Sequence, residues 1–227
     1  LEEGEKSLMT PAQVKALIRK ADGSGSHYPN GSLVCVENTS NLGGGACYDL
    51  ETLDAIAEVA TSMDCKTHVD GARIFNAAIA TGVDVDRMCQ AYDSVSICFS
   101  KGLGAPVGSV LVGSSEFIAK AHRWRKMFGG GWRQAGILAA GCLYALDHHV
   151  ERLKEDHERA SYVATELNSL DGFSVDLDTV QTNMVYVECQ RPASEVAEIL
   201  AASGIDVFDI SPTHIRVVIH LHITDED

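Results

Sequence analysis

The sequence predicts an α/β protein with a mostly parallel sheet covered by helices. Two observations predict this class. Short apolar runs at 32–38, 66–70 and 94–100 alternate with segments of helical apolar spacing, and turn-forming residues follow each run. Since parallel strands need a long crossover between them, such alternation favours strand–helix–strand units. The composition agrees, because 45% hydrophobic and 22% charged residues among 227 are typical of a folded protein.

The elements of the first half follow from local signals. Thr10 and Pro11 are an N-cap and a first-turn proline, so a helix is expected from residue 11 to about residue 20. Glycine, serine, asparagine and proline dominate 22–32, which predicts a loop. Asp49 is expected to cap a further helix. The remaining expected elements are helices at 49–62 and 74–81 and strands at 32–38, 66–70, 94–100 and 108–113.

The second half reads as helices followed by a small mixed unit. Helical spacing covers 115–128, and then 133–147 and on to about 168. A turn at Gly172 separates these helices from the rest of the chain. The expected elements there are strands at 173–177, 184–188 and 213–223 and a helix at 193–202. We therefore divide the chain into a large sheet domain (1–120), linking helices (121–168) and a small α+β domain (169–227).

Charge and cysteine usage restrict the partners and the compartment. The 18 basic and 32 acidic residues give a net charge of −14, which disfavours nucleic acid and anionic membranes as partners. The seven cysteines are unevenly spaced without a Cys-x-x-Cys pair, so we expect reduced thiols and no metal site. No apolar stretch is long enough to span a bilayer, and the first residues lack signal-peptide features. These observations predict a cytoplasmic protein.

Polar side chains stand where the predicted strands end. In open parallel sheets, ligands gather beyond the carboxyl ends of the strands. Several polar groups at one such edge are more telling than any one alone. The residues concerned are Asn38, Thr39 and Asn41 after the first strand, Asp70 and Arg73 at the end of the second, Ser100 and Lys101 at the end of the third, and Arg216 inside the last strand of the small domain.

Lys101 and Asp70 carry the most specific chemistry. Lys101 follows an apolar strand and precedes a glycine-rich turn, so its amine would be partly desolvated, which makes it a better nucleophile for imine formation. Asp70 ends the neighbouring strand, and a carboxylate beneath a pyridine nitrogen keeps that ring protonated. Together they indicate a cofactor site. The alternatives are an exposed lysine that opens a turn and an aspartate that caps the turn at Gly71.

Two long segments of the sequence resemble a known enzyme family. Residues 68–77, His-Val-Asp-Gly-Ala-Arg-Ile-Phe-Asn-Ala, are similar to the His-x-Asp-Gly-Ala-Arg segment of the L-threonine aldolases. Residues 99–109, Phe-Ser-Lys-Gly-Leu-Gly-Ala-Pro-Val-Gly-Ser, resemble the segment with that family's Schiff-base lysine. Further matches, in the family's order, occur at 37–39, 128–136, 182–184 and 215–216. The ordered set spans nearly the whole chain.

The resemblance implies a low-specificity L-threonine aldolase type of enzyme within the beta-eliminating lyases. The implied fold is fold type I, that of aspartate aminotransferase, with helices on both faces of the large sheet and a small C-terminal α+β domain. The implied cofactor is pyridoxal 5'-phosphate. A homo-oligomer, either a dimer or a tetramer, is implied as well.

By position in the matching segments, the resemblance also implies residue roles. Lys101 would bind the cofactor covalently, Asp70 would hold its pyridinium, and Arg73 and Arg216 would grip a substrate carboxylate, which matches the planar guanidinium. The implied cofactor set is Lys101, Asp70, Arg73, Arg133 (reaching the phosphate, in a neighbouring subunit) and His68; the implied substrate set is Arg73, Arg216, Asn38 and Ser40. From the residues alone, structural roles are favoured: a buried histidine at 68, a strand-edge arginine at 216, and an ion pair of Arg73 with an acid such as Asp84.

The implied reaction cleaves L-threonine, L-allo-threonine or another 3-hydroxy amino acid to glycine and an aldehyde. One alternative is another fold-type-I lyase or a serine hydroxymethyltransferase relative. Another is an inactive, N-terminally shortened family member that acts only as an oligomer partner, because we expect the phosphate-binding glycine turn and the ring-stacking residue to come from an upstream segment. Ser40 stands where many members have histidine, a departure that concerns the substrate's hydroxyl.

Overall fold

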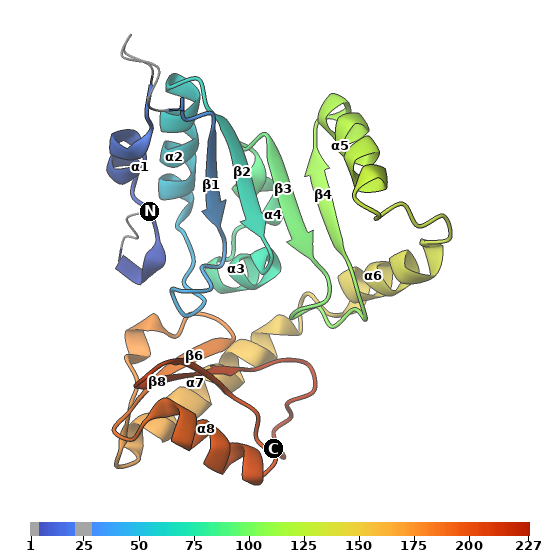
Figure 1. Ribbon diagram of the computed structural model, residues 1–227. Coiled ribbons are helices and arrows are strands. Elements are labelled where there is room, and N and C mark those ends of the chain that lie inside the picture. The colour runs from blue at the N-terminus through green and yellow to red at the C-terminus, as the bar shows by residue number, and fades with distance from the viewer. Residues whose placement is uncertain (1–4, 21–28) are drawn as a thin grey trace.

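The computed structural model describes residues 5–20 and 29–227 and contains two four-stranded sheets (Figure 1). The helices are α1 (Pro11–Leu17), α2 (Leu50–Ser62), α3 (Ile74–Thr81), α4 (Val85–Cys89), α5 (Ser115–Met127), α6 (Gly136–His148), α7 (Leu153–Ser169) and α8 (Ala193–Ala202), with 3-10 helices η1 (Glu5–Ser7) and η2 (Leu177–Thr179). The strands are β1 (Leu33–Glu37), β2 (Lys66–Gly71), β3 (Ser94–Cys98), β4 (Ser109–Gly113), β5 (Phe173–Ser174), β6 (Met184–Cys189), β7 (Phe208–Ser211) and β8 (His214–Val218). No helix in the described part of the chain is long and apolar enough to cross a membrane.

The first sheet has the strand order β1-β2-β3-β4. The β1–β2 and β2–β3 pairs are parallel, and each connection carries helices: α2 in the first, α3 and α4 in the second. The β3–β4 connection is too short for a helical crossover, so β4 runs antiparallel to β3. The α/β class and the mostly parallel sheet are therefore confirmed.

One face of the first sheet holds the large core. Alternate strand residues point to this face and pack against α2, α3 and α4. The buried members include Val34, Val36, Val69, Val95, Leu53, Ile56, Ile74 and Met88. On the opposite face Leu33 and Asp70 are exposed, and α5 lies farther along, beside β4 (Figure 1). The carboxylate expected in the cofactor site therefore faces away from the core.

The second sheet is antiparallel, with the order β5-β6-β8-β7, and α7 and α8 pack against it. Figure 1 shows this sheet beyond the carboxyl ends of β1, β2 and β3. The loop after β1 joins the two units: the Cys47 N–H donates to Gln181 Oε1 (2.8 Å), and the Thr182 hydroxyl donates to the Gly45 carbonyl (2.9 Å). The sheet edge with the candidate residues thus faces the small domain.

The structure differs from the sequence expectations at several elements. The helical stretch expected up to 168 is interrupted between α6 and α7, where the His149 ring hydrogen-bonds the Leu103 carbonyl (2.6 Å), a tertiary contact without a local sequence signal. The short elements α4 and β7 were not expected, and β8 ends at Val218 because the chain turns away after it. Most of the loop expected at 22–32 lies outside the described residues.

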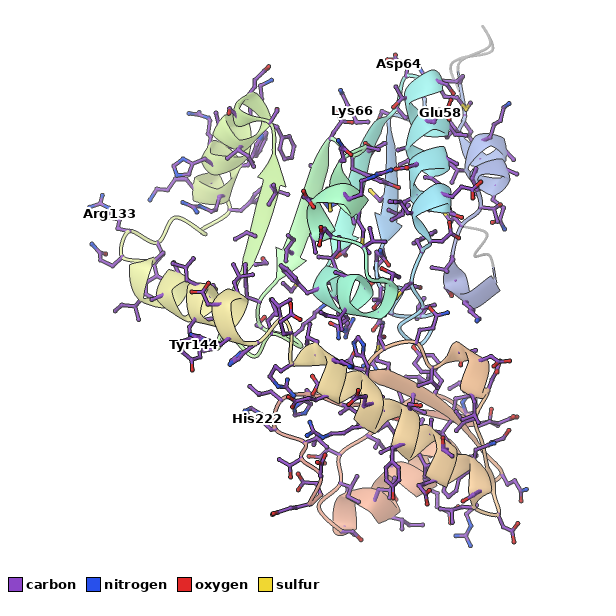
Figure 2. The ribbon with its side chains drawn as sticks, turned by 180° about the vertical axis from the view of Figure 1, so that it is seen from behind. Glu58, Asp64, Lys66, Arg133, Tyr144 and His222 are labelled. Atoms are coloured by element: carbon purple, nitrogen blue, oxygen red, sulfur yellow. The ribbon has the colours of Figure 1, made fainter. Side chains whose placement is uncertain are left out.

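We expect Ile56→Ala to destabilise the protein by about 2–5 kcal/mol, because the fully buried side chain would leave a cavity against the sheet. Urea unfolding measures this loss. Glu58→Ala, on the exposed side of the same helix (Figure 2), should change stability by less than about 0.5 kcal/mol. Equal losses in the two variants would contradict the assigned core face of α2.

Candidate active site

The candidate residues of three strands gather at the carboxyl edge of the first sheet. The parallel register places Glu37 beside Asp70 and Asp70 beside Ser96, so the ends of β1, β2 and β3 are level. The loops that follow carry Asn41, Arg73 and Lys101. Since the small domain faces this edge, Arg216 on β8 can reach the same place (Figure 1).

Lys101 lies in a loop that main-chain hydrogen bonds close at its base. The Phe99 N–H donates to the Gly108 carbonyl (3.0 Å), and the Ala105 N–H donates to the Phe99 carbonyl (2.9 Å). Gly104, at φ 68°, forms a turn in which its N–H donates to the Lys101 carbonyl (2.8 Å). The Lys101 side chain is exposed, and its amine has no hydrogen-bond or ion-pair partner among residues 5–20 and 29–227. A closed loop therefore presents an unpaired amine at the sheet edge. The partial desolvation expected for this amine is not found in the described structure, because the glycine-rich turn leaves the side chain exposed.

The Asp70 carboxylate lies on the face of the sheet away from the large core. Its Oδ1 accepts the Ala72 N–H (3.1 Å), which orients the group at the end of β2 while the side chain stays exposed. His68, two residues earlier on the same face, is half-buried, and its Nδ1 lies 2.8 Å from the Ser94 hydroxyl. An exposed carboxylate on β2 and a free lysine amine after β3 are the groups that suit a cofactor with a protonated ring nitrogen and an aldehyde, as in pyridoxal 5'-phosphate.

Two arginines from different domains share one oxygen atom. Arg73 follows β2 at the start of α3, and its NH1 donates to Asn41 Oδ1 (3.4 Å). Arg216 on β8 donates from its own NH1 to the same oxygen (3.1 Å). Burial and the nearby Arg216 charge lower the pKa of Arg73, yet an arginine remains charged at neutral pH. The pair places two positive charges around a neutral amide, and the nearby Glu37 carboxylate, which acts to raise the Arg73 pKa, offsets part of that charge. A net positive charge remains, which is the electrostatic setting of an anion site.

Arg216 has a hydrogen-bond donor, its Nε–H, that no described residue accepts. Its guanidinium carbon lies 5.1 Å from the centre of the Phe208 ring, a cation–π contact that orients the group. Its Nε is buried and has no hydrogen-bond partner in the described structure. Because a buried, unsatisfied N–H costs free energy, a ligand that supplies an acceptor is favoured there. A carboxylate, with two acceptor oxygens, meets this need.

Asn38 and Ser40 are not brought together with the arginine pair. Asn38 is fully buried, and its Oδ1 accepts the Tyr48 N–H (3.3 Å). The Ser40 hydroxyl accepts the Gly43 N–H (3.2 Å) and donates to the Ser7 carbonyl (3.4 Å). The contacts of both side chains hold the loop after β1, and their predicted contact with substrate stays a prediction.

Arg133 lies far from the other candidate residues. It is exposed on the connection between α5 and α6, where Figure 2 shows it pointing away from both sheets. Many large apolar side chains of the same region, residues 107–144, are exposed as well; they include Trp124, Phe128, Trp132, Ile137, Leu143 and Tyr144. The structure therefore does not bring Arg133 together with the other candidate residues of its own chain.

From the sequence, Asn41 is expected at the strand end without a role, and nothing in the sequence identifies Tyr186. The Tyr186 hydroxyl donates to the Asn41 carbonyl (2.6 Å). Tyr186 lies on β6, where it is the register partner of Arg216 on the neighbouring strand β8. The Tyr186–Asn41 hydrogen bond crosses from one domain to the other, as does the Arg216–Asn41 hydrogen bond. No local pattern signals them, because they depend on how the second sheet docks against the first.

Comparison with known proteins identifies the family. A family model described as beta-eliminating lyase matches residues 1–190. The chain is 42% identical to low-specificity L-threonine aldolase 1 of Arabidopsis thaliana over 98% of its own length and 63% of that protein, so it spans less than two thirds of that relative.

The Leishmania major threonine aldolase structure superposes with a TM-score of 0.79 at 15% identity, over 98% of this chain and 65% of that one. A structure of Oryza sativa TDC with PLP and tryptamine superposes with a TM-score of 0.71 at 18% identity, over 98% of this chain and 50% of that one. These matches confirm the predicted resemblance and the fold: the chain belongs to the beta-eliminating lyase family, with low-specificity L-threonine aldolases among its relatives.

Proposed function

We propose that this chain acts as a pyridoxal-5'-phosphate-dependent aldolase that cleaves L-threonine, L-allo-threonine or a related 3-hydroxy amino acid to glycine and an aldehyde. The observation that carries the proposal is that Lys101, Asp70 and Arg73 follow or end neighbouring strands at one edge of the first sheet, where Arg216 of the second sheet meets Arg73 on Asn41. The name of the Arabidopsis relative supports the reaction, and the PLP named with the Oryza sativa structure supports the cofactor.

Besides Arg73, which is assigned to both the cofactor and the substrate, four side chains are assigned to the cofactor. Asp70 would hold the ring nitrogen in its protonated form, and Lys101 would bind the cofactor through its free amine. His68 lies on the face that carries Asp70, and Arg133 would contact the phosphate in a neighbouring subunit. When bound, the cofactor supplies the electron sink for the bond that breaks at the substrate's Cα.

The arginine pair is assigned to the substrate's carboxylate. Guanidinium groups that approach from two domains hold the carboxylate at two points, so the amino acid cannot rotate freely. Its Cα–Cβ bond is thereby kept in one orientation relative to the sheet edge. Fixed orientation supplies a large part of the barrier reduction in reactions of this kind.

The alternative function is that of a lyase that catalyses β-elimination, because the same groups could bind and orient its substrate. Identification of the products formed from L-threonine distinguishes the two reactions. Cleavage of L-threonine gives glycine and acetaldehyde, whereas elimination gives a keto acid and ammonia.

We also propose a homo-oligomer. The apolar side chains exposed between residues 107 and 144 form a surface that water solvates poorly, and a second copy of the chain would bury it. Arg133 on this surface points away from its own sheet (Figure 2), as a residue that completes a neighbour's site would.

We expect pyridoxal 5'-phosphate to give a visible absorption band on binding, and borohydride reduction to fix it to Lys101 as shown by peptide mapping. Lys101→Ala should abolish the label. Lys66→Ala is the matched control, since Lys66 starts β2 at the opposite edge of the sheet and pairs with Asp93 (Figure 2). The Arabidopsis relative serves as the positive control. A band and label retained in Lys101→Ala would contradict the assignment.

We expect Arg216→Ala to raise the KM for L-threonine by roughly tenfold to a hundredfold, because one charged hydrogen bond to the carboxylate is lost. Cofactor loading should remain unchanged. Arg191→Ala, which removes an exposed small-domain arginine paired with Glu195, should change neither quantity. If Arg216→Ala released the cofactor, the role assigned to this residue would be wrong.

We expect Arg133→Ala and Lys101→Ala to be inactive separately and to regain partial activity when they are mixed and allowed to exchange subunits. A mixed oligomer would contain sites with an intact lysine from one copy and an intact arginine from the other. Aldehyde release measures the recovery. Mixtures that remain inactive although exchange is verified by mass would exclude a shared site.

A further inference from the structure

Among the described residues, Asn41 is the one that accepts hydrogen bonds from both arginines of the candidate site. Its hydrogen bonds come from both domains. Its main-chain N–H donates to Glu37 Oε2 (2.9 Å), and its carbonyl accepts the Tyr186 hydroxyl (2.6 Å). Its side-chain oxygen accepts NH1 of Arg73 (3.4 Å) and NH1 of Arg216 (3.1 Å). The main chain of Asn41 is thus held from both domains, and the two arginines orient its side-chain oxygen.

The chemistry of this oxygen matters because it is neutral. An amide oxygen has two lone pairs and can accept one hydrogen bond from each guanidinium. It thereby holds two like charges together without itself cancelling either of them, and the one nearby carboxylate, Glu37, leaves the group of three with a net positive charge. A carboxylate at the same place would form ion pairs with both arginines and would occupy them in place of a ligand.

We propose that Asn41 is a positioning residue that holds Arg73 and Arg216 as an open pair for the carboxylate of the substrate. The inference rests on the proposed function, in which this pair binds the carboxylate of a 3-hydroxy amino acid. It adds that a neutral acceptor at position 41 determines how tightly the carboxylate binds. Tyr186 supports the arrangement, because it lies beside Arg216 in register and holds the Asn41 main chain.

The arrangement also accounts for the unsatisfied Nε of Arg216. The Asn41 oxygen accepts one NH1 from each arginine, and the buried Nε of Arg216 retains an unused donor. The pair is therefore held in place by fewer acceptors than it can use. A bound carboxylate supplies the missing acceptors and the missing negative charge together.

The test uses the whole chain loaded with pyridoxal 5'-phosphate and measures two quantities, the dissociation constant of glycine by calorimetry and the thermal midpoint Tm. Asn41→Asp should weaken glycine binding by roughly tenfold or more while Tm stays equal or rises, because the new carboxylate pairs with the arginines. Asn41→Ala should lower both the affinity and Tm. With L-threonine, the KM of both variants should change more than kcat. Leu42→Ala, an exposed neighbour in the same loop, should behave as the unchanged protein.

A purely structural role predicts a different pattern, in which affinity falls only as Tm falls. Glycine binding that is unchanged in Asn41→Asp, or weakened only together with stability, would overturn the inference. Arg216→Ala in the same assay separates the two proposals. If it weakens glycine binding and Asn41→Asp does not, only the role of Asn41 fails. If neither it nor Asn41→Asp weakens binding, or if the unchanged chain binds no glycine, the carboxylate site fails as well.

Discussion

The hydrogen bonds of two guanidinium groups to the Asn41 side-chain oxygen join the two domains at the candidate site. Arg73 reaches this oxygen from the first sheet and Arg216 reaches it from the second. Like charges this close repel each other, so the arrangement needs an acceptor held firmly between them. Tyr186 of the small domain and Glu37 of the first sheet both hydrogen-bond the Asn41 main chain, next to the oxygen that the arginine pair shares.

The rest of the site depends on strand direction. Because β1, β2 and β3 are parallel, the residues after them meet at one edge, and the small domain faces that edge. The main chain of Phe99 hydrogen-bonds Gly108 and Ala105 across the β3–β4 connection, so Lys101 lies on a closed loop. Asp70 faces away from the large core because it alternates with the buried Val69 and Gly71. The carboxylate is therefore held by a strand of the sheet, and the lysine by a loop closed onto the neighbouring strand.

Much of this organisation is readable from the sequence, since β1, β2 and β3 are short apolar runs bounded by turns. The sequence also indicates Asp70, Arg73 and Lys101, because strand ends in a parallel sheet share an edge. It gives no signal for the hydrogen bonds of Asn41 and Tyr186, which arise only when the second sheet docks. The break between α6 and α7 is missed for the same reason, because His149 is held by a distant carbonyl. Long-range contacts leave no periodicity in the chain.

The most direct test of the carboxylate site is a crystal structure of the chain grown with pyridoxal 5'-phosphate and glycine. We expect the glycine carboxylate in contact with the guanidinium groups of both Arg73 and Arg216, with the cofactor ring nitrogen at Asp70. Asn41 should remain bound to at least one of the two arginines. A carboxylate bound away from the pair, with the cofactor in place, would contradict the assignment of the substrate site.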